Sequence, residues 1–171
     1  AIAEYEAAIR IDPDYADAHE NLGVVLEAIA GRRLEAISQF QAAIRIRPEV
    51  AEIRNKLGIA LADTPGRLED AIAQFREAIR IDPDFFAAHD NLALSLSKGG
   101  RKAEAIAEYE TAIRIKPDDA EGHNNLGIEF VSIPLRLPQA VAEFEEALRI
   151  RPDYAAAKEN LETARRMLGR R

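Results

Sequence analysis

The stretch Ala36–Pro48 reads AISQFQAAIRIRP, and it decides the fold of this chain. Its apolar and small residues recur at the three- and four-residue spacing that is typical of one face of an amphipathic helix. Proline ends that helix, because a helix interior has no place for a residue without a backbone N–H. The same pattern, with valine for isoleucine in the last copy, ends at Pro13, Pro48, Pro83, Pro117 and Pro152. Successive copies therefore lie 34 or 35 residues apart, which predicts an array of similar helical units.

Between successive copies the sequence predicts a second kind of helix. In the segment His19–Leu26, apolar side chains again follow helical spacing. Gly31, Gly66 and Gly100 are expected to form the tight turn between the two helices of a unit. The expected units are a truncated one at 1–15, complete ones at 16–50, 51–85, 86–119 and 120–154, and a capping helix at 155–171.

Each second helix carries alanines and one aromatic residue at fixed places. Alanine lets neighbouring helices approach to the lower end of the usual distance of about 8 to 10 Å. An aromatic series at helical spacing is more typical of a core than of a cofactor site, so no cofactor is expected. The residues are Ala36, Ala71, Ala105 and Ala140, then Phe40, Phe75, Tyr109 and Phe144, and then Ala43, Ala78, Ala112 and Ala147.

The first helices share a motif of leucine, a small residue and a further apolar residue. Its copies are Leu22-Gly23-Leu26, Leu57-Gly58-Leu61, Leu92-Ala93-Leu96 and Leu126-Gly127-Phe130. Together with the alanines, aromatics and prolines, this pattern resembles the tetratricopeptide repeat (TPR). It is similar to the repeats of bacterial TPR proteins and of O-linked N-acetylglucosamine transferase. The resemblance implies an all-α, right-handed α-α superhelix (a TPR solenoid) of antiparallel helix pairs, acting as a protein-interaction scaffold and not as an enzyme.

Composition argues against several classes of function. The formal net charge is -7, and no basic face dominates, so a nucleic-acid partner is not expected. The chain has no cysteine, which excludes disulfides, thiolate metal sites and a cysteine nucleophile. No apolar run approaches the roughly 18 to 20 residues that span a bilayer, so no membrane contact is expected. These features leave the cellular compartment open.

The residues that most often carry chemistry show no catalytic pattern. His19, His89 and His123 occupy the same place in three units, so stacking separates neighbours by roughly 10 Å. Zinc ligands lie about 2 Å from one ion, so no metal site is expected, and these side chains are interpreted as filling the slot of the family's usual aromatic. Glu129 replaces a small or apolar residue, and we expect it to be exposed. No phosphate-binding loop or nucleophile motif is present.

One row of polar residues on the first helices is interpreted as functional. Asparagine is a poor helix former, and its amide can both donate to and accept from a peptide backbone. The resemblance places this face in a concave groove, where the matching asparagines of the transferase hold peptide. The alternative is that each asparagine bonds to a neighbouring helix or to water. The predicted peptide-binding residues are Asn21, Lys56, Asn91, Asn125 and Asn160, the apolar Val24, Ile59, Leu94 and Ile128, and Asn55 and Asn124.

Acidic residues outnumber basic ones on that face by eight to three. Such a surface is expected to favour a protein or peptide partner with basic residues. The acids are Asp17, Glu20, Glu27, Glu52, Asp63, Asp90, Glu121 and Glu159, and the bases are Lys56, Lys98 and Arg166.

Two alternative functions remain open at this point. The apolar residues Ile2, Ile9 and Ile11 of the first segment are expected to lie partly open, so one alternative is that different chains join end to end through them. The chain starts without Met and in the middle of a repeat, so we expect it to be a piece of a longer protein. The other alternative is that this longer protein is an enzyme, such as a glycosyltransferase, with the array as its partner-selecting arm.

Overall fold

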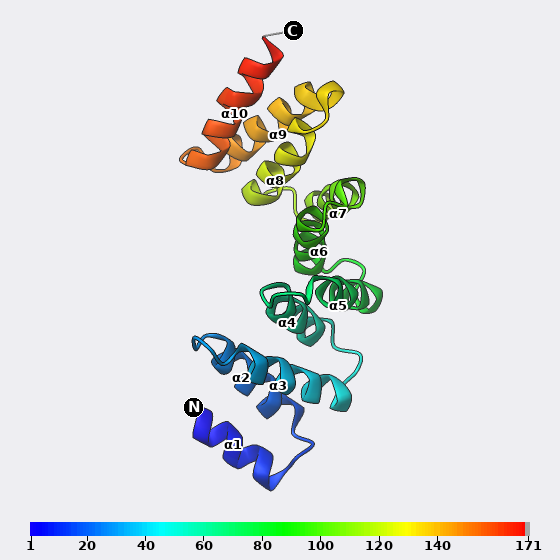
Figure 1. Cartoon of the computed structure of the whole chain (residues 1–171), viewed down its shortest axis with the longest axis vertical. Helices are drawn as coiled ribbons and strands as arrows, with labels where there is room; N and C mark the ends of the chain where they lie inside the picture. The colour runs from blue at the N-terminus through cyan, green and yellow to red at the C-terminus, as the bar shows by residue number, and fades with distance from the viewer. Residues whose placement is uncertain (170–171) are drawn as a thin grey trace. The chain divides into compact units, whose positions relative to one another are not determined.

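The computed structural model describes residues 1–169, except for the side chain of Pro134. This part of the chain forms α-helices and one short 3-10 helix, and contains no strand (Figure 1). In chain order they are α1 (Ile2–Ile11), α2 (Ala16–Glu27), α3 (Arg33–Ile46), α4 (Ala51–Ala62), α5 (Leu68–Ile81), α6 (Phe86–Lys98), α7 (Lys102–Ile115), α8 (Ala120–Val131), η1 (Pro134–Arg136), α9 (Leu137–Ile150) and α10 (Ala155–Leu168). The all-α class is confirmed, and none of the described helices is long and apolar enough to cross a membrane.

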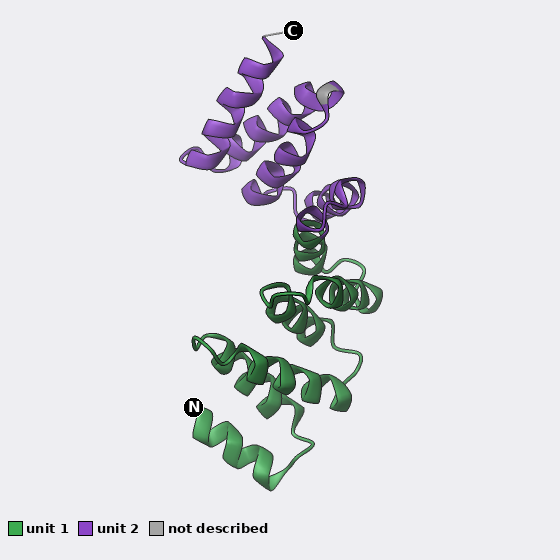
Figure 2. Cartoon of the chain, viewed as in Figure 1, with its two compact units in different colours: residues 1–95 green, residues 96–171 purple. Residues whose placement is uncertain are grey.

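The chain divides into two compact units, residues 1–95 and 96–171, whose boundary falls inside α6 (Figure 2). In unit 1, α2 packs against α3 and α4 against α5. In unit 2, α9 packs against both α8 and α10. The repeat boundaries proposed from the sequence fall in the turns before α2, α4, α6, α8 and α10.

The small and aromatic residues form the core of each unit, as predicted. In unit 1, Phe40 is completely buried between α2 and α3, and a Cβ atom added to Gly23 would stand 2.7 Å from its ring. In unit 2, Phe144 is buried in the same way, and a Cβ on Gly127 would stand 2.6 Å from that ring. Such distances are well below van der Waals contact, so the first helix has glycine where the aromatic ring presses against its backbone.

The turns between paired helices confirm the role predicted for three glycines. Gly31, Gly66 and Gly100 have φ angles of 84°, 77° and 76°, a region that only glycine enters without steric cost. The turn between α8 and α9 has no such glycine, and the 3-10 helix η1 takes its place. The connections within the helix pairs are therefore short.

The histidines have structural partners in the turn before their own helix. His19 Nε2 donates to the carbonyl oxygen of Pro13 at 3.1 Å, and its Nδ1 lies 2.7 Å from Gln39 Oε1. Arg54, at the same place in the next repeat, donates from Nε to the carbonyl of Pro48 at 3.1 Å. These side chains thus satisfy a backbone carbonyl in the turns before α2, α4, α6 and α8. No group of residues in the described part of the chain has the arrangement of a metal site.

Glu129 is buried, and the expectation that it is exposed is wrong. Its side chain lies at 6% exposure and accepts a hydrogen bond from the hydroxyl of Ser97. Because this partner lies 32 residues earlier in the chain, the residues around Glu129 carry no sign of it. A hydrogen-bonded partner is what makes burial of a carboxylate tolerable.

Candidate functional site

The residues predicted to bind peptide lie on the first helices of both units. In unit 1, Val24 and Leu94 are exposed on α2 and α6, and Ile59 on α4 is half-buried. In unit 2, Ile128 on α8 is exposed. Apolar side chains on this face therefore point away from the core, as the spacing predicts, and are accessible to another molecule.

A hollow of about 490 Å³ opens on this face in unit 1, beside α4 and the turn that leads into α6. Ile59 and Phe85 provide its apolar surface, and Glu52, Lys56 and Asp82 provide charged groups around them. Phe85 directly precedes α6 and is only half-buried, so its ring remains available. This arrangement is typical of a pocket for one apolar side chain with polar groups that fix its orientation.

Polar residues on the same face link neighbouring first helices. The Asn91 Nδ2 on α6 donates to Asn55 Oδ1 on α4 at 3.1 Å. Lys56 Nζ on α4 donates to Glu20 Oε1 on α2 at 2.7 Å, at the same separation of 36 residues. In unit 2, an equivalent bond of 2.9 Å joins two asparagines, Asn160 on α10 and Asn124 on α8. Each bond crosses from one repeat to the next, so these residues help to fix how the repeats stack.

These bonds change the set of residues that can touch a ligand. Asn55 and Asn124 are exposed by only 7% and 3%, and each accepts the bond from the next repeat; Asn55 also lines the hollow beside α4. Asn21 is exposed and Asn125 half-buried, and neither has a side-chain hydrogen bond among residues 1–169. The amides available for a ligand are therefore chiefly Asn21 and Asn125, together with the remaining groups of Asn91 and Asn160.

Lys56 is held as a cation by the carboxylates around it. Burial alone lowers its pKa, but hydrogen bonds to Glu20 and Glu52 outweigh that effect and raise the pKa. The distances from Nζ to the two carboxylates are 2.7 and 2.8 Å. Lys56 therefore neutralises part of the acidic surface at the edge of the hollow.

The electrostatic character of the face differs between the units. In unit 1, Arg47 reaches Asp17 and lies 3.6 Å from Glu20, so the acidic excess there is smaller than the sequence count suggests. In unit 2, Glu121 and Glu159 are exposed, and no ion pair neutralises either of them within the described residues. The exposed Lys98 and Arg166 lie on first helices of the same unit, so the counted charges of unit 2 balance and the acidic excess of the face lies in unit 1.

Two of the residues that surround the hollow, Phe85 and Asp82, were not singled out from the sequence. Both belong to the turn between second and first helices, where the family pattern marks only the proline. A signal was nevertheless present, because an aromatic follows the Pro-Asp turn at Tyr15, Phe85 and Tyr154. Glu52 was counted only as one of the acidic residues of the face, because the sequence does not show that it lies beside the turn that carries Asp82 and Phe85.

Two family models match this chain. The model described as "TPR repeat" matches residues 1–29 and 95–128, and the one described as "Tetratricopeptide repeat" matches residues 30–85. The chain belongs to the tetratricopeptide repeat family. TPR repeats generally mediate protein–protein interactions and serve as non-catalytic scaffolds.

Solved TPR structures are similar over most of the chain. A crystal structure of MamA has 26% sequence identity and a TM-score of 0.82, with 90% of this chain and 88% of that one covered. YrrB, described as a TPR protein with an unusual peptide-binding site, has 22% identity and a TM-score of 0.77, with 92% and 80% covered. TTC0263, a thermophilic TPR protein of Thermus thermophilus, has 21% identity and a TM-score of 0.70, with 95% and 88% covered. No curated protein sequence gives a significant match.

Proposed function

We propose that this TPR chain is a scaffold that binds an extended or helical segment of a partner protein along the face of its first helices. The observation that carries the proposal is the hollow of about 490 Å³ beside Ile59 and Phe85. It lies on the same face as the exposed Val24 and Leu94. An apolar pocket beside further exposed apolar side chains is a surface that a partner can cover with a gain in free energy.

The pocket is suited to one aliphatic side chain of the partner. Full burial of a leucine or isoleucine side chain is worth about 1.5 to 3 kcal/mol, which makes this contact the anchor of the interaction. The amide of Asn21, on a first helix of the same unit, then supplies a donor and an acceptor for the partner's backbone. Such contacts hold a peptide without reading its side chains, so selectivity comes from the pocket and from charge.

Charge favours a partner segment with basic residues. Glu52 and Asp82 border the pocket in unit 1 and are exposed. Asp17 is also exposed on the first-helix face of this unit. Complementary charge speeds association and discriminates against acidic partners more than it adds affinity.

A peptide-array screen tests the proposal. The chain should bind peptides in which an aliphatic residue is flanked by lysine or arginine, and binding should weaken as salt rises. At the pocket of Ile59 and Phe85, followed by NMR titration, matched peptides with glutamate in place of the basic residues should bind less. No selection for aliphatic residues, or equal binding of the acidic set at that pocket, would count against the proposal.

Self-association through α1 is a second candidate, favoured by one observation. The helix contains no buried residue, and Ile11 is 86% exposed. A second copy that covers this surface would give a mass that rises with concentration. Light scattering over a wide concentration range measures this, and a constant monomer mass would exclude it.

A further inference from the structure

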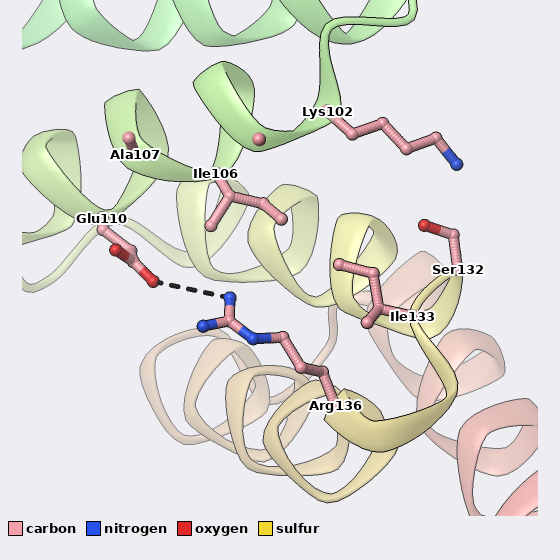
Figure 3. A pocket seen from close by; sticks show the side chains of 8 residues that line it. Lys102, Ile106, Ala107, Glu110, Ser132, Ile133 and Arg136 are labelled. Carbon is pink, nitrogen blue, oxygen red and sulfur yellow. Dashed lines mark ion pairs between the residues drawn. The ribbon is translucent and has the colours of Figure 1, made fainter.

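A second hollow, of about 560 Å³, lies in unit 2 between α7 and the turn that leads from α8 to α9 (Figure 3). Ile106 of α7 and Ile133 of the turn give it an apolar surface. Lys102 and Arg136 contribute positive charge, and Glu110 lies at one side. None of the residues proposed above for the first-helix face lines this hollow, so it is a separate surface.

Lys102 lacks the anionic partner that its counterpart in unit 1 has. The residue at the same helix position in α3 is Arg33, which donates to the carbonyl of Asp63 at 2.9 Å and lies 3.7 Å from its carboxylate. In unit 2, the place of Asp63 is taken by Ser132, whose hydroxyl donates to the backbone of Glu129 at 2.8 Å. The anion that neutralises Arg33 therefore has no equivalent beside Lys102.

Arg136 likewise lacks the acid that pairs with its counterparts. In the other repeats the arginine before the second helix pairs with an acid three residues later. Those pairs are Arg32–Glu35, Arg67–Asp70 and Arg101–Glu104. After Arg136 the third residue is Gln139, which is neutral. Arg136 instead lies over the Phe130 ring at 4.6 Å, with Nη1 3.9 Å from Glu110 Oε1, a distance too long for a hydrogen bond.

We propose that this hollow binds a segment of a partner protein in which an aspartate or glutamate adjoins an aliphatic residue. The aliphatic side chain packs against Ile106 and Ile133, and the carboxylate lies between the Lys102 ammonium and the Arg136 guanidinium. We choose an acidic partner because of charge complementarity. In unit 1, Asp63 neutralises Arg33 and Asp70 neutralises Arg67, whereas in unit 2 neutral residues stand at both acidic positions. The carboxylate of the partner would provide the missing negative charge. This proposal does not depend on binding at the first-helix face.

The test uses the whole chain and the peptide acetyl-GGLEELGG-amide, with acetyl-GGLQQLGG-amide as its uncharged match. NMR titration should shift the signals of Ile106 and Ile133 with the first peptide and not with the second. Restoring the internal acids with Ser132→Asp and Gln139→Asp should weaken binding at least about tenfold, a change of about 1.4 kcal/mol. Glu110→Gln removes the competing carboxylate and should strengthen binding about two- to fivefold, the range of an exposed ion pair.

The control is Lys158→Gln, which removes an exposed cation on α10 and should leave the affinity unchanged. The proposal would be overturned if the two peptides bound equally or if the NMR shifts were confined to Asn125 and Ile128. It would also be overturned if the acid-restoring and Glu110→Gln variants bound the peptide with unchanged affinity. Tighter binding of a peptide that ends in a free carboxylate would assign the site to chain ends and overturn the choice of an internal acid. If an acid-restoring variant misfolds, the Glu110→Gln variant still decides, because its predicted effect has the opposite sign.

Discussion

The side-chain amide of Asn91 donates a hydrogen bond of 3.1 Å to the side-chain carbonyl of Asn55, 36 residues earlier in the chain. The same relationship recurs between Asn160 and Asn124 at 2.9 Å. Both acceptor residues are almost fully buried. These bonds join consecutive first helices at the edge of the proposed binding face, so part of the asparagine row stabilises the array and part is available to a ligand.

Asn55→Ala should lower the free energy of unfolding by about 1 kcal/mol, because it removes the hydrogen bond from the half-buried amide of Asn91. Urea unfolding followed by circular dichroism measures this. Asn21→Ala is the matched control, since Asn21 is exposed and has no side-chain hydrogen bond in the described chain; its effect should stay within about 0.5 kcal/mol. Equal effects of the two substitutions would show that the pair adds no stability.

Gly127→Ala should destabilise the fold by about 1 to 3 kcal/mol, the range for an overpacked core. The added Cβ would stand 2.6 Å from the ring of Phe144, which is completely buried and has no room to move. Gly169→Ala serves as control, because its Cβ would come no closer than 3.6 Å to another atom. Thermal melting compares the two, and an unchanged melting temperature in Gly127→Ala would contradict the packing argument.

His123 should make stability depend on pH. A hydrogen bond from Nδ1 to Glu143 raises the pKa of His123 more than burial lowers it, and the carbonyl of Pro117 raises it further. Both ring nitrogens face acceptors, so the folded state favours the imidazolium form. The stabilisation is therefore complete below the unfolded pKa of about 6.5, and it is lost as pH rises through the higher folded pKa.

NMR titration of the His123 ring checks this directly. Replacing Glu143 by glutamine should lower the pKa of His123 and flatten the dependence of unfolding free energy on pH above about 6.5. The variant thus removes the anion and keeps an acceptor of the same size. A His123 pKa that does not change in Glu143→Gln would contradict the assigned cause.

Sequence periodicity predicted the helices, the turns and the core of this chain well, because each depends on local spacing. Phe40, Gly23 and Gly31 each belong to the motif that recurs every 34 or 35 residues. The burial of Phe40 against Gly23 and the positive φ of Gly31 could therefore be predicted from the sequence. The bond between Asn91 and Asn55 was left open as an alternative, and that between Ser97 and Glu129 was missed. In both cases the partners lie in different repeats, and their contact depends on the reach of the side chains.

The candidate site was only partly predictable for the same reason. Ile59 and Val24 follow from helical spacing, since they fall opposite the leucine and glycine that face the core. Phe85 lines the pocket from a turn, where no periodicity applies. The charge of the face was overestimated in unit 1, because the long side chain of Arg47 reaches Asp17 from outside the face on which charges were counted.

We propose above that the pocket of Ile59 and Phe85 anchors a partner segment. The most direct test is the affinity of the best basic-aliphatic peptide from the array for the Ile59→Ser and Phe85→Ser variants. The control is Leu34→Ser, which changes a leucine on α3 that is 66% exposed and lies outside the pocket.

We predict that each pocket variant loses at least about tenfold in affinity, equivalent to about 1.4 kcal/mol, while helicity is retained and Leu34→Ser binds like the unmodified chain. Unchanged affinity in both pocket variants, measured by isothermal titration calorimetry, would show that this pocket does not anchor the partner.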